Sequence, residues 1–195
     1  MKSDPGDGDL LQGLSAGDEA CFSLLYQRHQ GAVYRFALHM TGNHGSAEDI
    51  TQEVFMILIR EPRRYDPSRG SLRSFLFGVS RNCVLRMLDR ECTPALSMDE
   101  IALENAAPAD ALDLAGELER SDTIERVRKA VLSLPPGYRE VVVLCDLNEM
   151  SYAEAAEVLE CAVGTVRSRL HRARALLAGK LTSLRKLDPR PAGER

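Results

Sequence analysis

The chain has 195 residues, of which 44% are hydrophobic and 28% charged, as is usual for a globular protein of one or two domains. Its net charge of -4 argues against a uniformly basic nucleic-acid binder. The acidic start argues against a signal peptide, and the lack of an apolar run of about 20 residues argues against direct membrane insertion. Five scattered cysteines and four histidines argue against a disulfide framework and a metal site. We expect buried thiols in a reducing cytoplasm; a redox role for Cys83 or Cys92 is the alternative.

The N-terminal part of the chain predicts a disordered segment and then a helical domain. Residues 1–9 are acidic and glycine-rich, and we expect them to be disordered. The helical domain is predicted over residues 10–91. Asp18 can cap its first helix, which continues past Gly31 until Thr41–Gly45 breaks it.

Two further helices complete this predicted domain. Ser46 is the expected cap of the first, with Asp49 three residues later as an acidic variant of the capping box, and Pro62 ends it. Ser71 caps the second after a turn-rich loop. The buried stripes are expected to contain Ile50, Val54, Ile57 and Leu58 in the first helix, and Leu72, Phe75, Leu76 and Val79 in the second. Left on the outer faces of the second helix are Arg73, Arg81, Asn82, Arg86 and Arg90.

Charge is segregated in the C-terminal half. Between Ser97 and Glu125 there are nine acidic residues and one arginine, which predicts a flexible acidic linker over residues 92–121. A second helical domain is expected over residues 122–187, and residues 188–195 are expected to be unstructured. Its first amphipathic helix carries Ile124, Val127, Val131 and Leu134, and the next begins at Pro136 after the break at Pro135.

The segment Ser151–Leu177 has the pattern of a helix-turn-helix. Ser151 and Glu154 have the spacing of a capping box. The apolar face of this first helix comprises Tyr152, Ala155, Ala156 and Leu159. A second helix then buries Val166, Leu170, Ala173 and Leu177, and leaves Arg167, Ser168, His171, Arg172 and Arg174 off the stripe. Such a basic helix can enter the DNA major groove; the alternative is a helical hairpin with a solvated basic face. The predicted fold class is all-α, with two small helical domains, the second containing the helix-turn-helix.

Three strings in order resemble the extracytoplasmic-function (ECF) group of bacterial sigma-70 factors. Residues 46–55 (SAEDITQEVF) are similar to the family's core-polymerase-binding helix, and residues 74–82 (SFLFGVSRN) to its promoter-melting helix. Residues 134–141 (LPPGYREV) and 163–174 (VGTVRSRLHRAR) are similar to its fourth conserved region. Phe75 stands where tryptophan is frequent in the family, and Glu160 stands in the turn where glycine is common.

The resemblance assigns roles to particular side chains. It makes residues 10–91 sigma region 2 and residues 122–187 sigma region 4. It implies core-polymerase binding by Asp49, Gln52, Glu53 and Met56. It implies contacts to the -10 element, including a flipped base near Asn82, by Arg73, Arg81, Asn82 and Arg86. It implies contacts to the -35 element by Thr165, Arg167, Ser168, His171, Arg172 and Arg174, although Arg169 and Arg174 are alternatively partners of phosphates or of acids within the domain.

The function implied is that of a cytoplasmic sigma factor. It would bind core RNA polymerase and promoter DNA, direct initiation through the -10 and -35 elements, and be controlled by an anti-sigma factor. It would be no enzyme, with no catalytic residue, metal, cofactor or small-molecule substrate. One alternative is a free-standing helix-turn-helix regulator that does not act through core polymerase; another is an interaction module that sequesters a partner.

Overall fold

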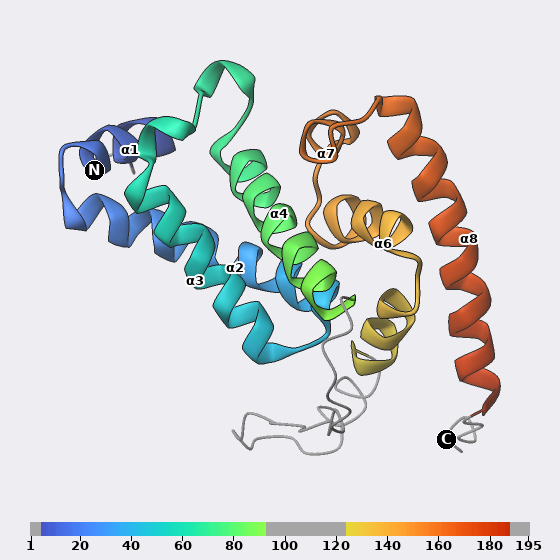
Figure 1. Cartoon of the computed structure of the whole chain (residues 1–195). Helices are drawn as coiled ribbons and strands as arrows, with labels where there is room; N and C mark the ends of the chain where they lie inside the picture. Colours follow the sequence, from blue (N-terminus) through green and yellow to red (C-terminus); the bar gives the residue numbers. More distant parts are fainter. Residues whose placement is uncertain (1–4, 93–123, 188–195) are drawn as a thin grey trace, which may run out of the picture.

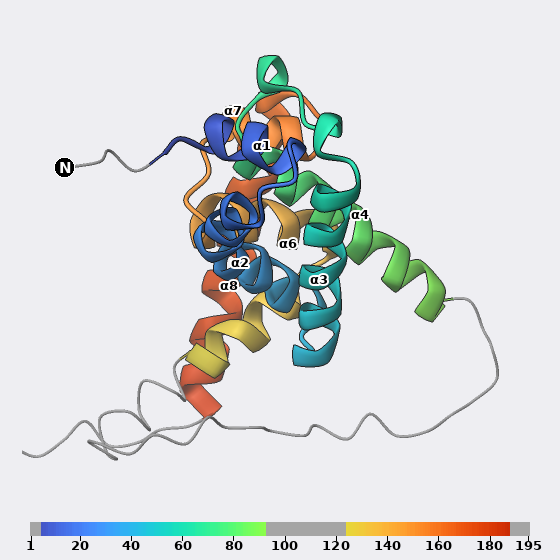
Figure 2. The same cartoon turned by 90° about the vertical axis from the view of Figure 1, so that its left-hand side faces the viewer.

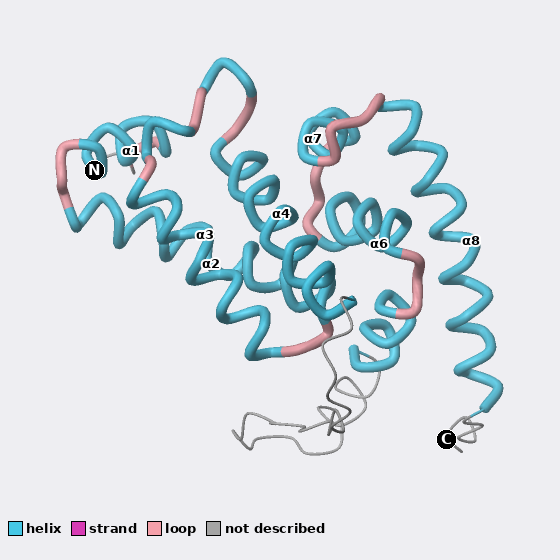
Figure 3. Tube along the Cα trace, in the orientation of Figure 1, coloured by secondary structure: helices cyan, strands magenta, loops and turns pink. Residues whose placement is uncertain are grey.

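The structure, a computed structural model, describes residues 5–92 and 124–187, and all regular elements in these ranges are helical (Figures 1 and 3). The all-α prediction is therefore confirmed. Apart from Cys92, which ends a helix, the predicted linker lies outside the described residues, as does the predicted tail. The N-terminal helices are α1 (Asp7–Ser15), α2 (Glu19–Thr41), α3 (His44–Arg60) and α4 (Leu72–Cys92), with the short 3-10 turns η1 (Pro62–Arg64) and η2 (Pro67–Arg69) between α3 and α4.

Helices α2, α3 and α4 pack on one another around an aromatic and aliphatic core. Phe36 and Phe77 are essentially unexposed, and their ring centroids are 5.5 Å apart. Leu58 and Leu72 are also buried against this core. Burial of side chains of this size contributes about 1.5–3 kcal/mol each, so the core is the main source of stability for the N-terminal domain. The last turns of α4 project away from it (Figure 2).

Some helix caps were predicted and others were not. The Asp18 side chain accepts hydrogen bonds from the amides of Ala20 and Cys21, which confirms the predicted cap of α2. The predicted Ser46 cap is wrong, because α3 begins at His44 and its cap is Asn43, whose side chain accepts from the Ser46 amide at 2.9 Å. Ser46 therefore lies inside the first turn.

Helix α1 begins inside the segment that the sequence predicts to be disordered. Its first residue, Asp7, contacts two residues of α2: its carboxylate forms an ion pair with Arg28 Nη1 at 2.5 Å and lies within hydrogen-bond distance, 2.9 Å, of His29 Nε2. Leu10 and Leu11 are the buried residues of α1. The prediction for residues 1–9 is thus wrong from Asp7 onward, because contacts to a later helix stabilise a segment whose own composition favours disorder.

The C-terminal domain begins with a helix over residues 124–132 and continues with α6 (Pro136–Val142), the π-helical turn η3 (Val143–Leu147), α7 (Tyr152–Val158) and α8 (Val163–Leu187). Pro136 occupies the first turn of α6, as predicted. The predicted stripe is only partly right: Val131 and Leu134 are buried, whereas Ile124 is 66% exposed.

The two domains lie against each other, with α4 beside α7 and α2 in contact with α6 and η3 (Figures 1 and 2). Gly42, after α2, shows how close the approach is. Its backbone is left-handed (φ 76°), and a Cβ there would lie 2.8 Å from Leu132 Cδ1. The backbone conformation therefore favours glycine, and a larger residue would also require the Leu132 side chain to move.

Candidate functional site

The helix-turn-helix is formed by α7, a short turn and the start of α8. Its capping box is complete: the Glu154 amide donates to Ser151 Oγ at 3.2 Å, and the Ser151 amide donates to Glu154 Oε2 at 2.9 Å. Hydrogen bonds from the Ser151 hydroxyl and the Ser151 amide lower the pKa of the Glu154 carboxyl. Ala155, Ala156 and Leu159 are buried as predicted, while Tyr152 is 37% exposed. The turn contains Glu160 with φ 52°, a left-handed conformation that explains why glycine is common there in the family.

The capping box gives a first prediction. Replacing Ser151 by alanine removes the acceptor for the Glu154 amide, so the free energy of unfolding should fall by about 1 kcal/mol. Urea denaturation followed by far-UV circular dichroism measures this. Ser168→Ala serves as the control, since the Ser168 hydroxyl is exposed and donates only to the Thr165 carbonyl within the same helix. A loss as large in the control would contradict the assigned role of the cap.

Helix α8 presents its cations to solvent and its apolar stripe to the core. Val166, Leu170 and Ala173 are buried and Leu177 is half-buried, as the pattern predicts. All five residues predicted off the stripe are exposed: Arg167, Ser168, His171, Arg172 and Arg174. Thr165 is half-buried at the start of the helix. The exposed side of α8 is therefore available to a polyanion.

The exposed arginines of α8 differ in their contacts with the rest of the protein. Arg174 makes a two-point ion pair with Asp146, with Nε–Oδ2 and Nη2–Oδ1 distances of 3.0 and 2.5 Å, and the pKa of Arg174 is raised by it. Arg167 lies over the Tyr152 ring, 5.9 Å from its centroid. Arg172 forms no hydrogen bond or ion pair with any other described residue. Arg172 is thus the arginine best able to turn toward a base edge.

Helix α4 carries four residues predicted to contact DNA, and the structure separates them. Asn82 and Arg86 are exposed, and Arg86 Nη2 lies 2.7 Å from Glu53 Oε1 of α3. Arg73 and Arg81 were expected on the outer surface, but both are half-buried. Arg81 Nε donates to Glu140 Oε1 of α6 at 2.8 Å, and Arg73 donates to the Asn148 carbonyl oxygen after η3. The C-terminal domain covers this side of α4, and a pattern of neighbouring residues cannot predict such a contact.

Phe75 was predicted to belong to the core, but it is only half-buried. Its ring packs against Tyr65 with centroids 5.7 Å apart, and the Tyr65 hydroxyl donates to the Gly70 carbonyl at 3.0 Å. The loop before α4 is thus fixed to the start of that helix by an aromatic pair.

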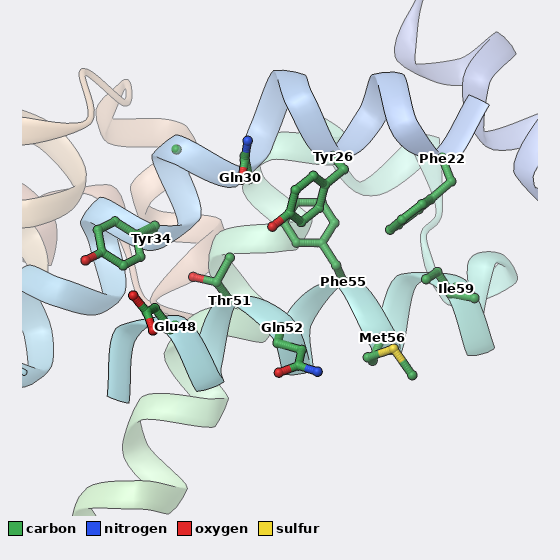
Figure 4. A pocket seen from close by; sticks show the side chains of 11 residues that line it. Phe22, Tyr26, Gln30, Tyr34, Glu48, Thr51, Gln52, Phe55, Met56 and Ile59 are labelled. Carbon is green, nitrogen blue, oxygen red and sulfur yellow. The ribbon is translucent and has the colours of Figure 1, made fainter. Parts of the chain in front are cut away.

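A groove of about 600 Å³ runs between α2 and α3 (Figure 4). Gln52 and Met56 of the predicted polymerase-binding set line it, together with aromatic and polar residues that the sequence analysis did not single out: Phe22, Tyr26, Tyr34, Glu48, Phe55 and Ile59. Tyr26 and Phe55 form the floor, with ring centroids 4.8 Å apart. Met56 and Ile59 are more than a third exposed, so the groove offers an apolar edge to a partner.

Asp49 and Glu53 lie elsewhere on α3. They line a second, smaller hollow of about 200 Å³ with Cys83 and Arg86 of α4. The four predicted polymerase contacts are therefore divided between two neighbouring hollows, an apolar one and a charged one. Their spacing along one helix could not distinguish these surroundings.

Two family models match the chain, "Sigma-70 region 2" over residues 25–91 and "Sigma-70, region 4" over residues 124–177. The ECF RNA polymerase sigma factor SigW of Bacillus subtilis is 31% identical over 186 residues, which cover 89% of this chain and 96% of SigW. The chain belongs to the ECF RNA polymerase sigma factors. The ECF sigma-E factor of Escherichia coli is likewise 31% identical, with 91% and 95% covered. SigE of Mycolicibacterium smegmatis is 34% identical, but this chain spans only 62% of its length.

Two solved structures that are similar to this chain have the same fold. CnrH, in a complex with the cytosolic domain of CnrY, matches with a TM-score of 0.68 and 28% identity over 91% of this chain and 97% of that one. RpoE of Bartonella quintana, in a complex with the anti-sigma factor NepR, matches with a TM-score of 0.64 and 25% identity over 83% and 96%. In this sigma factor, the region 2 match extends from within α2 to the end of α4, and the region 4 match extends from residue 124 to the middle of α8.

The cysteines of the sigma factor are free thiols where their side chains are described. Burial raises the pKa of Cys83, and burial and Asp146 raise the pKa of Cys145 to about 11. The side chain of Cys92 lies outside the described residues. Within the described ranges no three His, Cys, Asp or Glu side chains are grouped to hold a metal ion, and no helix is long and apolar enough to span a membrane.

These thiols give a second prediction. The thiolate is the reactive form of a cysteine. At pH 8 the thiolate fraction of Cys145 should be about a hundredfold smaller than that of a thiol with an unshifted pKa, so Cys145 should react slowly with iodoacetamide. Cys83 should also react slowly, because it is buried. Timed alkylation and peptide mass spectrometry would show this, with the protein in urea as the control. Equally fast reaction of Cys83 in the folded and unfolded chain would favour the redox alternative.

Proposed function

We propose that this ECF sigma factor binds core RNA polymerase, directs it to promoters through the -10 and -35 elements, and helps to open the -10 region. The observation that carries the proposal is that the two domains of one chain have different binding surfaces. One domain has an apolar groove beside an acidic helix, and the other has a helix-turn-helix whose second helix exposes three arginines.

In this proposal the polymerase docks on α3 through Asp49, Gln52, Glu53 and Met56. Met56 and the aromatic floor of the groove supply apolar contact, while Asp49 and Glu53 attract a basic partner surface. Exposed charges at the rim chiefly direct the encounter, and the packed centre holds the complex. A free-standing regulator would need neither feature, and this is why we favour the sigma factor over that alternative.

In the same proposal DNA is contacted at two places. Arg167, Ser168, His171 and Arg172 of α8 face the major groove of the -35 element, and Thr165 and Arg174 contact its backbone. On α4, the exposed amide of Asn82 both donates and accepts, which suits it to the edge of a flipped base. Arg73, Arg81 and Arg86 would bind phosphates of the opened strand.

The proposal also includes the place where the protein acts and the partner that regulates it. The protein acts by binding, without a reaction of its own, in the cytoplasm where core polymerase and promoters meet. An anti-sigma factor is a fitting partner because the similar RpoE of Bartonella quintana was solved with one.

The test is run-off transcription with purified bacterial core polymerase on a genomic promoter library, with mapping of the 5′ ends. Discrete starts that share two upstream elements are expected. Absence of initiation, together with specific DNA binding by the chain alone, would instead favour a free-standing regulator. A matched reaction without the chain gives the background of core polymerase.

A further inference from the structure

The loop between α3 and α4 (residues 61–71) is held in one shape by a tyrosine. The Tyr65 hydroxyl donates to the Gly70 carbonyl oxygen at 3.0 Å, so a hydrogen bond joins the two halves of the loop. The Tyr65 ring packs against the Phe75 ring, with centroids 5.7 Å apart and planes inclined by 61°. Because Phe75 belongs to the first turn of α4, Tyr65 fixes the loop to that helix as well as closing it.

The surroundings of Tyr65 keep its side chain in this position. Tyr65 is half-buried, and α1 contacts the turn η1 that directly precedes it. Burial and the negative charges of Asp7 and Asp66 raise the pKa of the Tyr65 hydroxyl, so the group remains a hydrogen-bond donor at neutral pH. Helix α1 lies before residue 25, where the region 2 match begins, and therefore supports the loop from outside the matched residues.

The tip of the loop is ordered by its own residues. It arches beyond the start of α4 (Figures 1 and 2). Asp66 Oδ1 accepts from the amide and the hydroxyl of Ser68, at 2.9 and 2.7 Å, and so shapes the turn η2. Gly70 has φ 142°, which a residue with a Cβ rarely adopts, so the direction of the carbonyl that accepts from Tyr65 depends on glycine at this position.

This tip exposes groups that suit an opened DNA strand. Arg63 and Arg69 are exposed and form no hydrogen bond or ion pair with another described residue, and the Asp66 carboxylate is exposed beside them in the sequence. A guanidinium can bind a phosphate, which gives affinity without sequence information. A guanidinium or a carboxylate at a fixed position can instead bind the edge of an unstacked base, which gives specificity.

The tip of the loop and Asn82 are too far apart to bind the same base. Asn82 follows Leu72, the first residue of α4, by ten positions, which is about 15 Å along the helix axis. The loop arches away from the opposite end of this stretch. A base that contacts the tip is therefore a different base of the strand from the one at Asn82, and its recognition can be measured separately.

We infer that Tyr65 is a positioning residue for promoter recognition: it holds the loop 61–71 so that the exposed tip distinguishes a base of the -10 element other than the one at Asn82. The inference rests on the proposed function, because it takes the opened -10 strand as the ligand. One base is distinguished from the other three only when donors and acceptors are held at fixed positions, whereas phosphate contacts carry no sequence information. Loss of the Tyr65 hydroxyl therefore reduces discrimination more than affinity.

The test uses the holoenzyme with Tyr65→Phe, which keeps the ring that packs on Phe75 and removes only the hydrogen bond to Gly70. Tyr138→Phe is the matched control, because Tyr138 lies in α6, is half-buried, and its hydroxyl forms no hydrogen bond with a described residue. Binding to a labelled fork DNA with an opened -10 region is measured by competition, with each -10 base changed in turn to the other three. Circular dichroism verifies that each variant is folded.

Tyr65→Phe should lower the discrimination at one -10 position by about tenfold, within the range expected for one base contact. The affinity for the matched DNA should change by less than about threefold, since the phosphate contacts remain. The affected position should differ from the one that Asn82→Ala affects, and Tyr138→Phe should change neither quantity. An equal loss at every position, as a merely structural role would give, or a loss at the Asn82 position alone, would overturn the inference.

Gly70→Ala tests whether the hydroxyl acts through the loop, because alanine does not readily keep φ 142° and the acceptor carbonyl is displaced. It should lose discrimination at the same position as Tyr65→Phe, and the double variant should lose no more than the larger single loss. Additive losses would overturn the role of this hydrogen bond. If the wild-type holoenzyme distinguishes no -10 base, the proposed function itself fails; discrimination that Tyr65→Phe leaves intact overturns only the role of Tyr65.

Discussion

Replacing Arg139 by methionine should lower the free energy of unfolding by about 3 kcal/mol, because hydrogen bonds to charged groups contribute about 1.5–3 kcal/mol each and the methionine keeps only the apolar stem. The Arg139 guanidinium donates to Met40 O at 2.6 Å, to Leu134 O at 3.2 Å and to Leu132 O. It joins the end of α2 to two carbonyls of the C-terminal domain. Its burial lowers its pKa from the usual value, yet an arginine stays protonated at neutral pH.

Urea denaturation measured by circular dichroism would test this prediction, with Arg64→Met as the control. Arg64 is 53% exposed and contacts only Glu61 at 3.5 Å, so its replacement should change stability by less than about 0.5 kcal/mol. A loss in Arg139→Met no larger than that of the control would show that water replaces the three hydrogen bonds at no cost. A separate early unfolding step of the C-terminal domain would fit the expected role of Arg139 at the domain boundary.

The role of Arg139 also marks what the sequence could not reveal. The residue lies within the string that resembles region 4, but its partner Met40 is 99 positions earlier in the chain. The same holds for Arg81 with Glu140 and for Asp7 with His29. Such contacts depend on how the helices pack, and periodicity describes only one helix at a time. Arg73 and Arg81 were therefore placed on the correct helix but in the wrong surroundings.

Features determined by near neighbours were predicted well. The capping box of Ser151, the Asp18 cap and the start of α6 at Pro136 each depend on residues within three or four positions, and all are present. The prediction failed where two nearby residues could each cap the same helix: Asn43 caps α3 in place of Ser46. The exposed cations of α8 were found because an amphipathic helix fixes which side faces the core. The aromatic floor of the α2–α3 groove was missed because it comes from two helices.

Replacing Arg172 by alanine should lower the discrimination of the holoenzyme between a matched and a scrambled -35 element by about 1–3 kcal/mol, the contribution of one good contact between an arginine and a guanine. Arg172 is exposed on α8 and makes no hydrogen bond or ion pair with other described residues, so its guanidinium is available to a base. Arg174→Ala is the control from the same helix, with the same loss of one positive charge. Because Arg174 is held by Asp146, its loss should weaken binding to both DNAs alike and leave the discrimination intact.

The -35 sequence comes from the mapped transcription starts. Competition binding with matched and scrambled DNA gives, for each variant, the ratio of the two affinities. Equal losses of discrimination in both variants would contradict the division of roles, since a residue fixed by Asp146 would then distinguish bases as well as a free one does.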